Sequence, residues 1–186
     1  MPSKPELDVW DSCCLIAVLN NEQDKVPALL AQMQKYESGE AVLGVPNGVI
    51  SEIVRLADGS SASDPLRHFL ANPYIQVLTP TVEVGLLSGQ LQYRFDSRKI
   101  PEMKGKAIAA GCSNDQALRL RSRDAEILAT ALHYKANRLT TYDPFLRFLG
   151  QEYITKERGL VVDVPQTSFL PLDFSKQNGT QSTPGA

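Results

Sequence analysis

The sequence RDAEILATALHYKANRLTTYDPFLRF, residues 123–148, carries the clearest structural signal in this chain. Its first half places apolar residues three, four and seven positions after Asp124, which predicts an amphipathic helix with this carboxylate on its buried side. Its second half, residues 138–142, is rich in strand-forming residues and predicts a strand that delivers Asp143 at its carboxyl end. Ligands of open α/β sheets bind at that end of the strands, so both acids lie where such folds build sites.

The rest of the chain alternates between strands and helices. Short apolar runs predict strands at residues 7–10, 41–45, 75–78 and 159–164, and longer runs and helical periodicity predict helices at residues 13–19, 24–36, 49–57, 65–70, 82–95 and 144–149. This alternation implies right-handed crossovers and a mainly parallel sheet covered on both faces. The predicted fold class is therefore α/β.

Some segments allow finer predictions. The helix at 24–36 has an apolar face with Leu29, Leu30 and Met33, and the helix at 49–57 has a face with Val49, Glu52, Ile53 and Leu56. Residues 96–122 have weak periodicity. Within them Ser113 and Gln116 match a capping box, and Ser122 is a candidate cap for the next helix.

Length and composition describe an ordinary globular protein. The chain has 186 residues, 42% of them hydrophobic, and a net charge of -2. Its longest apolar run, residues 13–19, is far shorter than the roughly 20 residues that cross a bilayer, and the charged residues before it argue against a signal peptide. We therefore expect one domain over residues 7–165, a disordered tail over residues 175–186, no membrane association and a cytoplasmic location.

The cysteines and histidines do not form a metal-binding pattern. Cys13, Cys14 and Cys112 are an odd number without zinc-site spacing, which favours small buried thiols. His68 and His133 lie in unrelated segments and are interpreted as surface or packing residues.

Positive charge is concentrated in one segment. Residues 98–123 contain seven basic and two acidic residues, a local net charge of +5. This segment runs directly into Asp124, so it would bring phosphates close to Asp124 and to any carboxylates grouped with it. Arg119, Arg121 and Arg123 are candidate contacts to RNA phosphates. A solvated surface is the alternative interpretation.

Two further acids come from separate segments. Asp11 follows the first predicted strand, and Glu52 lies on the inward face of the helix at 49–57. With Asp124 and Asp143 they form four carboxylates that this fold could bring together, and their repulsion would require a cation, for which carboxylates favour Mg²⁺ or Mn²⁺. Such an ion would activate water against a phosphodiester. The acids expected to lie outside this group are Asp8, Asp115 and Asp163.

Three stretches carry a family resemblance: LDVWDSCCLIAVL at residues 7–19, VPNGVISEIVRL at residues 45–56 and RDAEILATALHYKANRLTTYDPFL at residues 123–146. Their content and order resemble the PIN-domain nucleases, and within that family the VapC-type toxins of bacterial toxin–antitoxin pairs. The third stretch is the most distinctive of the three.

The resemblance implies a three-layer α/β/α sandwich and a Mg²⁺-dependent endoribonuclease that a cognate antitoxin keeps silent, with a homodimer as a family-level expectation. The catalytic and metal-binding residues that it implies are Asp11, Glu52, Asp124 and Asp143. It also implies a supporting role for Ser12 as the hydroxyl neighbour of Asp11. Thr141 would orient Asp143 or a water, or serve in packing.

Other interpretations remain open. Asp11 and Asp143 could be helix N-caps, Asp124 a first-turn acid favoured by the helix dipole, and Glu52 a surface residue. The chain could then be a non-catalytic PIN-like module for RNA binding or protein interaction. A phosphatase with Asp11 as nucleophile is disfavoured, because Cys13 occupies the second acidic position of the Asp-x-Asp pattern.

Overall fold

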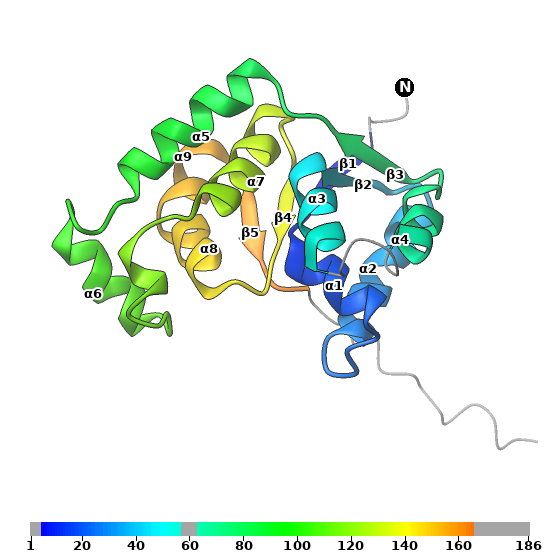
Figure 1. Ribbon diagram of the computed structural model, residues 1–186, viewed down its shortest axis with the longest axis horizontal. Coiled ribbons are helices and arrows are strands. Elements are labelled where there is room, and N and C mark those ends of the chain that lie inside the picture. The colour runs from blue at the N-terminus through cyan, green and yellow to red at the C-terminus, as the bar shows by residue number, and fades with distance from the viewer. Residues whose placement is uncertain (1–4, 57–62, 166–186) are drawn as a thin grey trace, which may run out of the picture.

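Five parallel strands form one sheet in the part of the chain that the computed structural model describes, residues 5–56 and 63–165. The strands are β1 (Glu6–Trp10), β2 (Ala41–Pro46), β3 (Ile75–Leu78), β4 (Arg138–Thr140) and β5 (Val161–Asp163). Their order in the sheet is β3-β2-β1-β4-β5 (Figure 1). The predicted parallel sheet is confirmed, whereas the predicted tail at residues 175–186 lies outside the described residues.

Helices cover both faces of this sheet, which confirms the expected α/β/α architecture. In the described ranges they are α1 (Ser12–Leu19), α2 (Val26–Glu37), α3 (Asn47–Leu56), α4 (Ser63–Leu70), α5 (Val82–Arg94), α6 (Pro101–Ala109), α7 (Ser122–His133), α8 (Pro144–Leu149) and α9 (Thr155–Arg158), with a 3₁₀ helix η1 (Gln116–Leu118) and a π-helical turn η2 (Gly150–Ile154). α2 packs on β2, α8 and η2 pack on β5, and α5 runs along α7 (Figure 1). None of the described helices is long and apolar enough to cross a bilayer.

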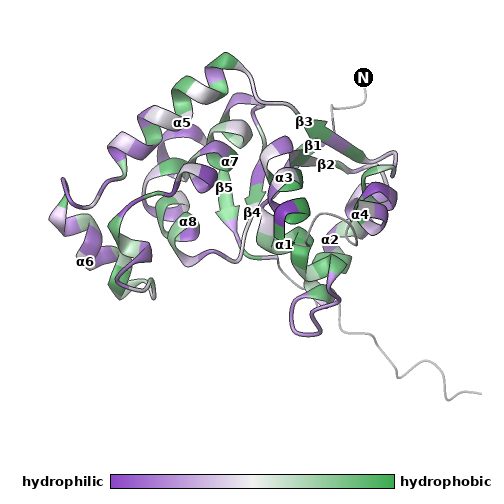
Figure 2. Ribbon diagram, viewed as in Figure 1, coloured by the Kyte–Doolittle hydropathy of each residue, from purple (hydrophilic) through white to green (hydrophobic). Residues whose placement is uncertain are grey.

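β1 lies in the middle of the sheet, so its end can meet several other segments. Val9 and Trp10 are fully buried, and β1 pairs with β2 on one side and with β4 on the other, where Trp10 aligns with Thr140. Figure 2 shows that the strands are predominantly hydrophobic, as expected for a sheet covered on both faces. This register brings Asp11, which follows β1, next to Thr141, which follows β4.

Two of the predicted apolar faces are partly wrong. Leu30 is 48% exposed because the buried stripe of α2 runs through Leu29 and Tyr36 instead. Leu56 is 56% exposed because it is the last residue of α3, one turn beyond the buried Ile53. In both cases the helix was predicted correctly, and the error lies in how much of its surface the neighbouring elements cover.

The weakly periodic segment before α7 contains one helix that the sequence did not predict. This helix, α6, buries few of its side chains, so it has no clear apolar stripe. The predicted capping box is confirmed, since the N–H of Ser113 donates to Gln116 Oε1 (3.0 Å) and the N–H of Gln116 donates to Ser113 Oγ (3.3 Å). The predicted cap at Ser122 is wrong, because Arg121 occupies the N-cap position and Ser122 is the first residue of α7.

Gly150, at the start of η2, lets the chain pass close to β5. A Cβ atom at this position would collide with the side chain of Val162, so Gly150→Ala is expected to lower the free energy of unfolding by about 3 kcal/mol. Gly89→Ala in α5 is the matched control, since nothing lies within 4 Å of its added Cβ and alanine favours a helix by about 1 kcal/mol. Urea denaturation compares the two variants, and equal stabilities would contradict this close packing.

Candidate carboxylate site

Asp11 lies at the carboxyl end of β1, where it is also the N-cap of α1. It is only 4% exposed. Its Oδ1 accepts the backbone N–H of Ser12 (2.6 Å) and the Ser12 hydroxyl (3.3 Å), and its Oδ2 accepts the Thr141 hydroxyl (2.7 Å) and the Cys13 thiol (3.2 Å). Burial raises the pKa of Asp11, and these hydrogen bonds oppose the rise. The carboxylate is therefore held in one orientation.

Thr141 links the ends of β1 and β4. Its hydroxyl donates to Asp11 and accepts the backbone N–H of Asp143 (2.9 Å). Asp143 is in turn the N-cap of α8, where its Oδ1 accepts the N–H of Leu146 (2.8 Å). Because Thr141 is fully buried, these bonds fix the positions of two acids at once. The sequence suggested only the contact with Asp143.

Asp124 and Glu52 come from two helices that pack together, α7 and α3. Gly48 of α3 lies so close to Arg123 and Glu126 of α7 that an added Cβ would collide with both side chains. Asp124 lies in the first turn of α7, as predicted, and is half-buried. The Oε2 atom of Glu52 is buried and has no hydrogen-bond partner among the described residues.

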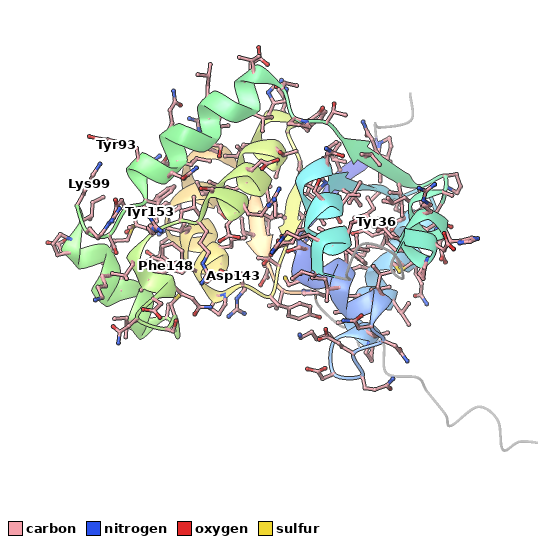
Figure 3. All side chains as sticks on the ribbon, in the orientation of Figure 1. Tyr36, Tyr93, Lys99, Asp143, Phe148 and Tyr153 are labelled. Carbon is pink, nitrogen blue, oxygen red and sulfur yellow. The ribbon has the colours of Figure 1, made fainter. Side chains whose placement is uncertain are left out.

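The charges of the other three acids contribute to the electrostatic environment of Asp124. The pKa of Asp124 is raised to about 7, first by burial and then by the negative charges of Asp143, Asp11 and Glu52, against the opposing charge of Arg121. Asp143 also contributes to the raised pKa of Asp11. The charges of Asp143, Asp11 and Glu52 therefore all act on Asp124. Asp143 lies near the middle of the molecule (Figure 3).

The donor set of this site suits a hard divalent cation. An unpaired buried carboxylate oxygen and several repelling carboxylates would all be stabilised by positive charge. Within residues 5–56 and 63–165, no three His, Cys, Asp or Glu side chains are close enough to enclose an ion together. Mg²⁺ takes one or two carboxylates directly and completes its octahedron with water.

Two groups beside these acids were not predicted. Cys13 was expected to be a buried thiol, but it is half-buried and donates to Asp11. Arg147 lies one helical turn after Asp143, and its Nε atom is buried without a hydrogen-bond partner among the described residues. Burial raises the pKa of Cys112, the charge of Asp143 raises it further, and the charge of Arg147 lowers it. The spacing of four residues between Asp143 and Arg147 was the available sequence signal.

The three arginines predicted to contact RNA differ in their surroundings. Arg123 forms an ion pair with Glu126 (3.5 Å) and lies against Gly48, so it supports the contact between α3 and α7. Arg119 and Arg121 instead line a hollow of about 130 Å³ beside the start of α7.

Asp8 lies outside the acidic group, as expected. Its carboxylate accepts the hydroxyl of Tyr36 (3.3 Å), which in turn accepts the Nε1–H of Trp10 (3.2 Å). Tyr36 lies well apart from Asp143 in Figure 3. Successive strand residues point to opposite faces, so residues two positions apart share a face. Asp8 therefore lies on the same face of the sheet as Trp10 and cannot join the site.

Comparison with known proteins identifies the family. The PIN domain family model matches residues 9–147. Among solved structures, a chain of VapBC2 from Rickettsia felis, bound to a DNA fragment from their promoter, is similar with a TM-score of 0.53 and 13% sequence identity over 84% of this chain and 98% of that chain. No curated protein matches the sequence significantly. Because the family model covers most of the chain, this protein belongs to the PIN domain family.

Proposed function

We propose that this protein is a Mg²⁺-dependent endoribonuclease that hydrolyses RNA phosphodiesters. The observations that support this most strongly are the link from Asp11 through Thr141 to Asp143 and the pKa of Asp124, which burial and the charges of the other three acids raise to about 7. A fold gains nothing from such repulsion unless a cation relieves it. Membership of the PIN family agrees with a nuclease.

The residues of the site would have different roles. Mg²⁺, when bound, supplies an activated water and neutralises charge on the phosphodiester. Asp11 and Asp143 are the best oriented acids, because Thr141 ties them together, and we assign them to direct contact with the ion. Glu52 has a buried oxygen without a partner among the described residues, and this oxygen can accept a hydrogen bond from a water. Asp124 adds a further negative charge that attracts the ion. Ser12 holds the Asp11 carboxylate in place through its N–H and its hydroxyl.

Removal of the Thr141 hydroxyl should weaken activity without unfolding the protein. Thr141→Val keeps the β-branched shape but deletes the bonds to Asp11 and Asp143, so we expect a loss of about 10–100-fold in cleavage rate. Thr141→Ser keeps the hydroxyl and should restore most of that rate. A Val variant as active as the Ser variant would show that the bridge has no role in catalysis.

We further propose an antitoxin partner, which the similarity to a VapBC2 complex supports. α5 has exposed apolar side chains at Val82, Leu86 and Tyr93, with exposed fractions of 75%, 65% and 72%. Their spacing places them along one side of the helix, where an amphipathic antitoxin helix or a second copy of the chain could pack. With RNA as substrate, the cytoplasm is the expected location.

The direct test uses the purified full chain with labelled RNA and with DNA of the same sequence. We expect RNA to be cut in Mg²⁺ or Mn²⁺, cleavage to stop in EDTA, and the DNA to remain intact. RNA binding without cleavage in either metal would instead support the non-catalytic module.

A further inference from the structure

The segment that leads into α7 presents two arginines on one side. Arg119 and Arg121 both have extended backbone conformations, with φ and ψ of -164° and 151° for the first and -70° and 154° for the second. In an extended chain, alternate side chains point the same way. Leu120, between them, is 2% exposed and anchors the segment to the core. The two guanidinium groups are therefore directed outward together.

These arginines line a small hollow that also contains the side-chain amide of Gln92. The hollow has a volume of about 130 Å³, and its remaining lining residues are Gln92, Leu120 and Ser122. The Ser122 hydroxyl donates to Gln92 Oε1 (3.2 Å), which leaves the Gln92 amide N–H groups available. No carboxylate is among the lining residues.

The N-terminus of α7 adds donors at the same place. Arg121 is the N-cap residue and makes no side-chain hydrogen bond to the first turn. The first backbone N–H groups of a helix have no partner within the helix, and they favour an anion. Because α7 has 12 residues, its dipole adds to the positive potential of the two arginines.

Neither Arg119 nor Arg121 forms an ion pair within the described ranges, 5–56 and 63–165. The backbone of Arg119 pairs with that of Asp96. However, the Asp96 carboxylate accepts Nε and Nη2 of Arg98 (2.8 and 2.7 Å), so it is already engaged.

We propose that this hollow is a phosphate-binding subsite that holds one backbone phosphate of the RNA next to the carboxylate site. The inference rests on the proposed nuclease function and assigns the work to Arg119 and Arg121, with Gln92 and the first turn of α7 as additional donors. Arg123 is left out because Glu126 and α3 engage it. Arg121 is the N-cap of α7 and Asp124 lies in its first turn, so a phosphate held here would lie near Asp124 and would set the register of the bound RNA strand.

The first test measures binding of inorganic phosphate to the metal-free, full-length chain in EDTA by ¹H–¹⁵N NMR. We expect saturable shifts of the Arg119 and Arg121 side-chain N–H signals and of the Ser122 backbone amide. The double variant Arg119→Gln/Arg121→Gln should weaken binding at least tenfold. Lys104→Gln/Lys106→Gln in α6 removes the same charge from the same basic segment and should leave binding unchanged. Equal weakening in both double variants, or shifts that never saturate, would overturn the subsite.

The second test separates this inference from the nuclease proposal. In RNA cleavage, Arg119→Gln/Arg121→Gln should raise KM about tenfold and leave kcat within twofold, whereas the lysine control should change neither. An unchanged KM with normal cleavage would overturn the subsite and leave the nuclease function standing. Saturable phosphate binding in a chain that cuts no RNA would overturn the nuclease function, and with it the assignment of the subsite to RNA.

Discussion

An Asp143→Asn variant is expected to lose Mg²⁺-dependent RNA cleavage by about 10³-fold, which corresponds to about 4 kcal/mol in activation free energy. Asparagine has the same shape as aspartate and caps helices equally well, so the bond from Asp143 Oδ1 to the Leu146 N–H at the start of α8 is retained. Only the negative charge is removed. The melting temperature should therefore stay within a few degrees of the unsubstituted protein.

The control for this experiment is Asp163→Asn, at the end of β5. Asp163 is the last residue of β5, so it also lies at the carboxyl edge of the sheet. Like Asp143, it accepts a backbone N–H, that of Val164 (2.8 Å). It lies outside the acidic group assigned to the ion, so its substitution should leave the cleavage rate within about twofold. If Asp143→Asn cuts RNA as fast as Asp163→Asn, the assignment of Asp143 is wrong.

The second large effect concerns stability as a function of pH. Burial and the neighbouring acids raise the pKa of Asp124 from 3.8 to about 7 in the folded protein. The folded state therefore binds more protons than the unfolded state between about pH 4 and pH 7, so metal-free stability falls as the pH rises through this window. At pH 8, Asp124→Asn should stabilise the metal-free protein by on the order of 2 kcal/mol, after allowance for partial solvent exposure.

Addition of Mg²⁺ should reverse the order of stability, so that the unsubstituted chain becomes more stable than Asp124→Asn. The unsubstituted chain should gain about 2.7 kcal/mol at a free Mg²⁺ concentration one hundred times Kd, because the ion binds only the folded state. Asp124→Asn should gain much less. Urea denaturation of both proteins at pH 5 and pH 8, with Mg²⁺ or with EDTA, measures the stability of each protein under these four conditions. A metal-free stability of the unsubstituted chain that is flat from pH 5 to pH 8 would contradict the repulsion inferred for Asp124.

The sequence predicted the strands and most of the helices because these depend on local patterns. Apolar runs bounded by turn residues predicted β3 without error, and the periodicity after Asp124 identified the buried side of α7. Asp11 and Asp143 follow strands and Asp124 lies in the first turn of α7, whereas Glu52 lies in the middle of α3. In a parallel sheet the ends of neighbouring strands share one edge, so the proximity of Asp11 and Asp143 could be expected without coordinates.

Other features depended on contacts that local patterns do not contain. The sequence does not distinguish Arg123 from Arg119 and Arg121. In the structure, however, Arg123 forms an ion pair with Glu126 and packs closely against Gly48. The Cys13 contact to Asp11 arises from the first turn of α1 and has no periodic signal. The exposure of Leu30 depends on where α2 contacts the sheet, which its own sequence does not determine. Prediction failed where tertiary packing, and not periodicity, decides the environment.

Crystals of the full chain grown with Mn²⁺ and measured at the manganese absorption edge would locate the ion without reference to activity. We expect an anomalous peak within bonding distance of the Asp11 and Asp143 carboxylates, with Glu52 and Asp124 around it, and no such peak in Asp143→Asn. Saturating Mn²⁺ that leaves this position empty, or that binds only elsewhere on the protein, would contradict the claim that these four acids share one divalent cation.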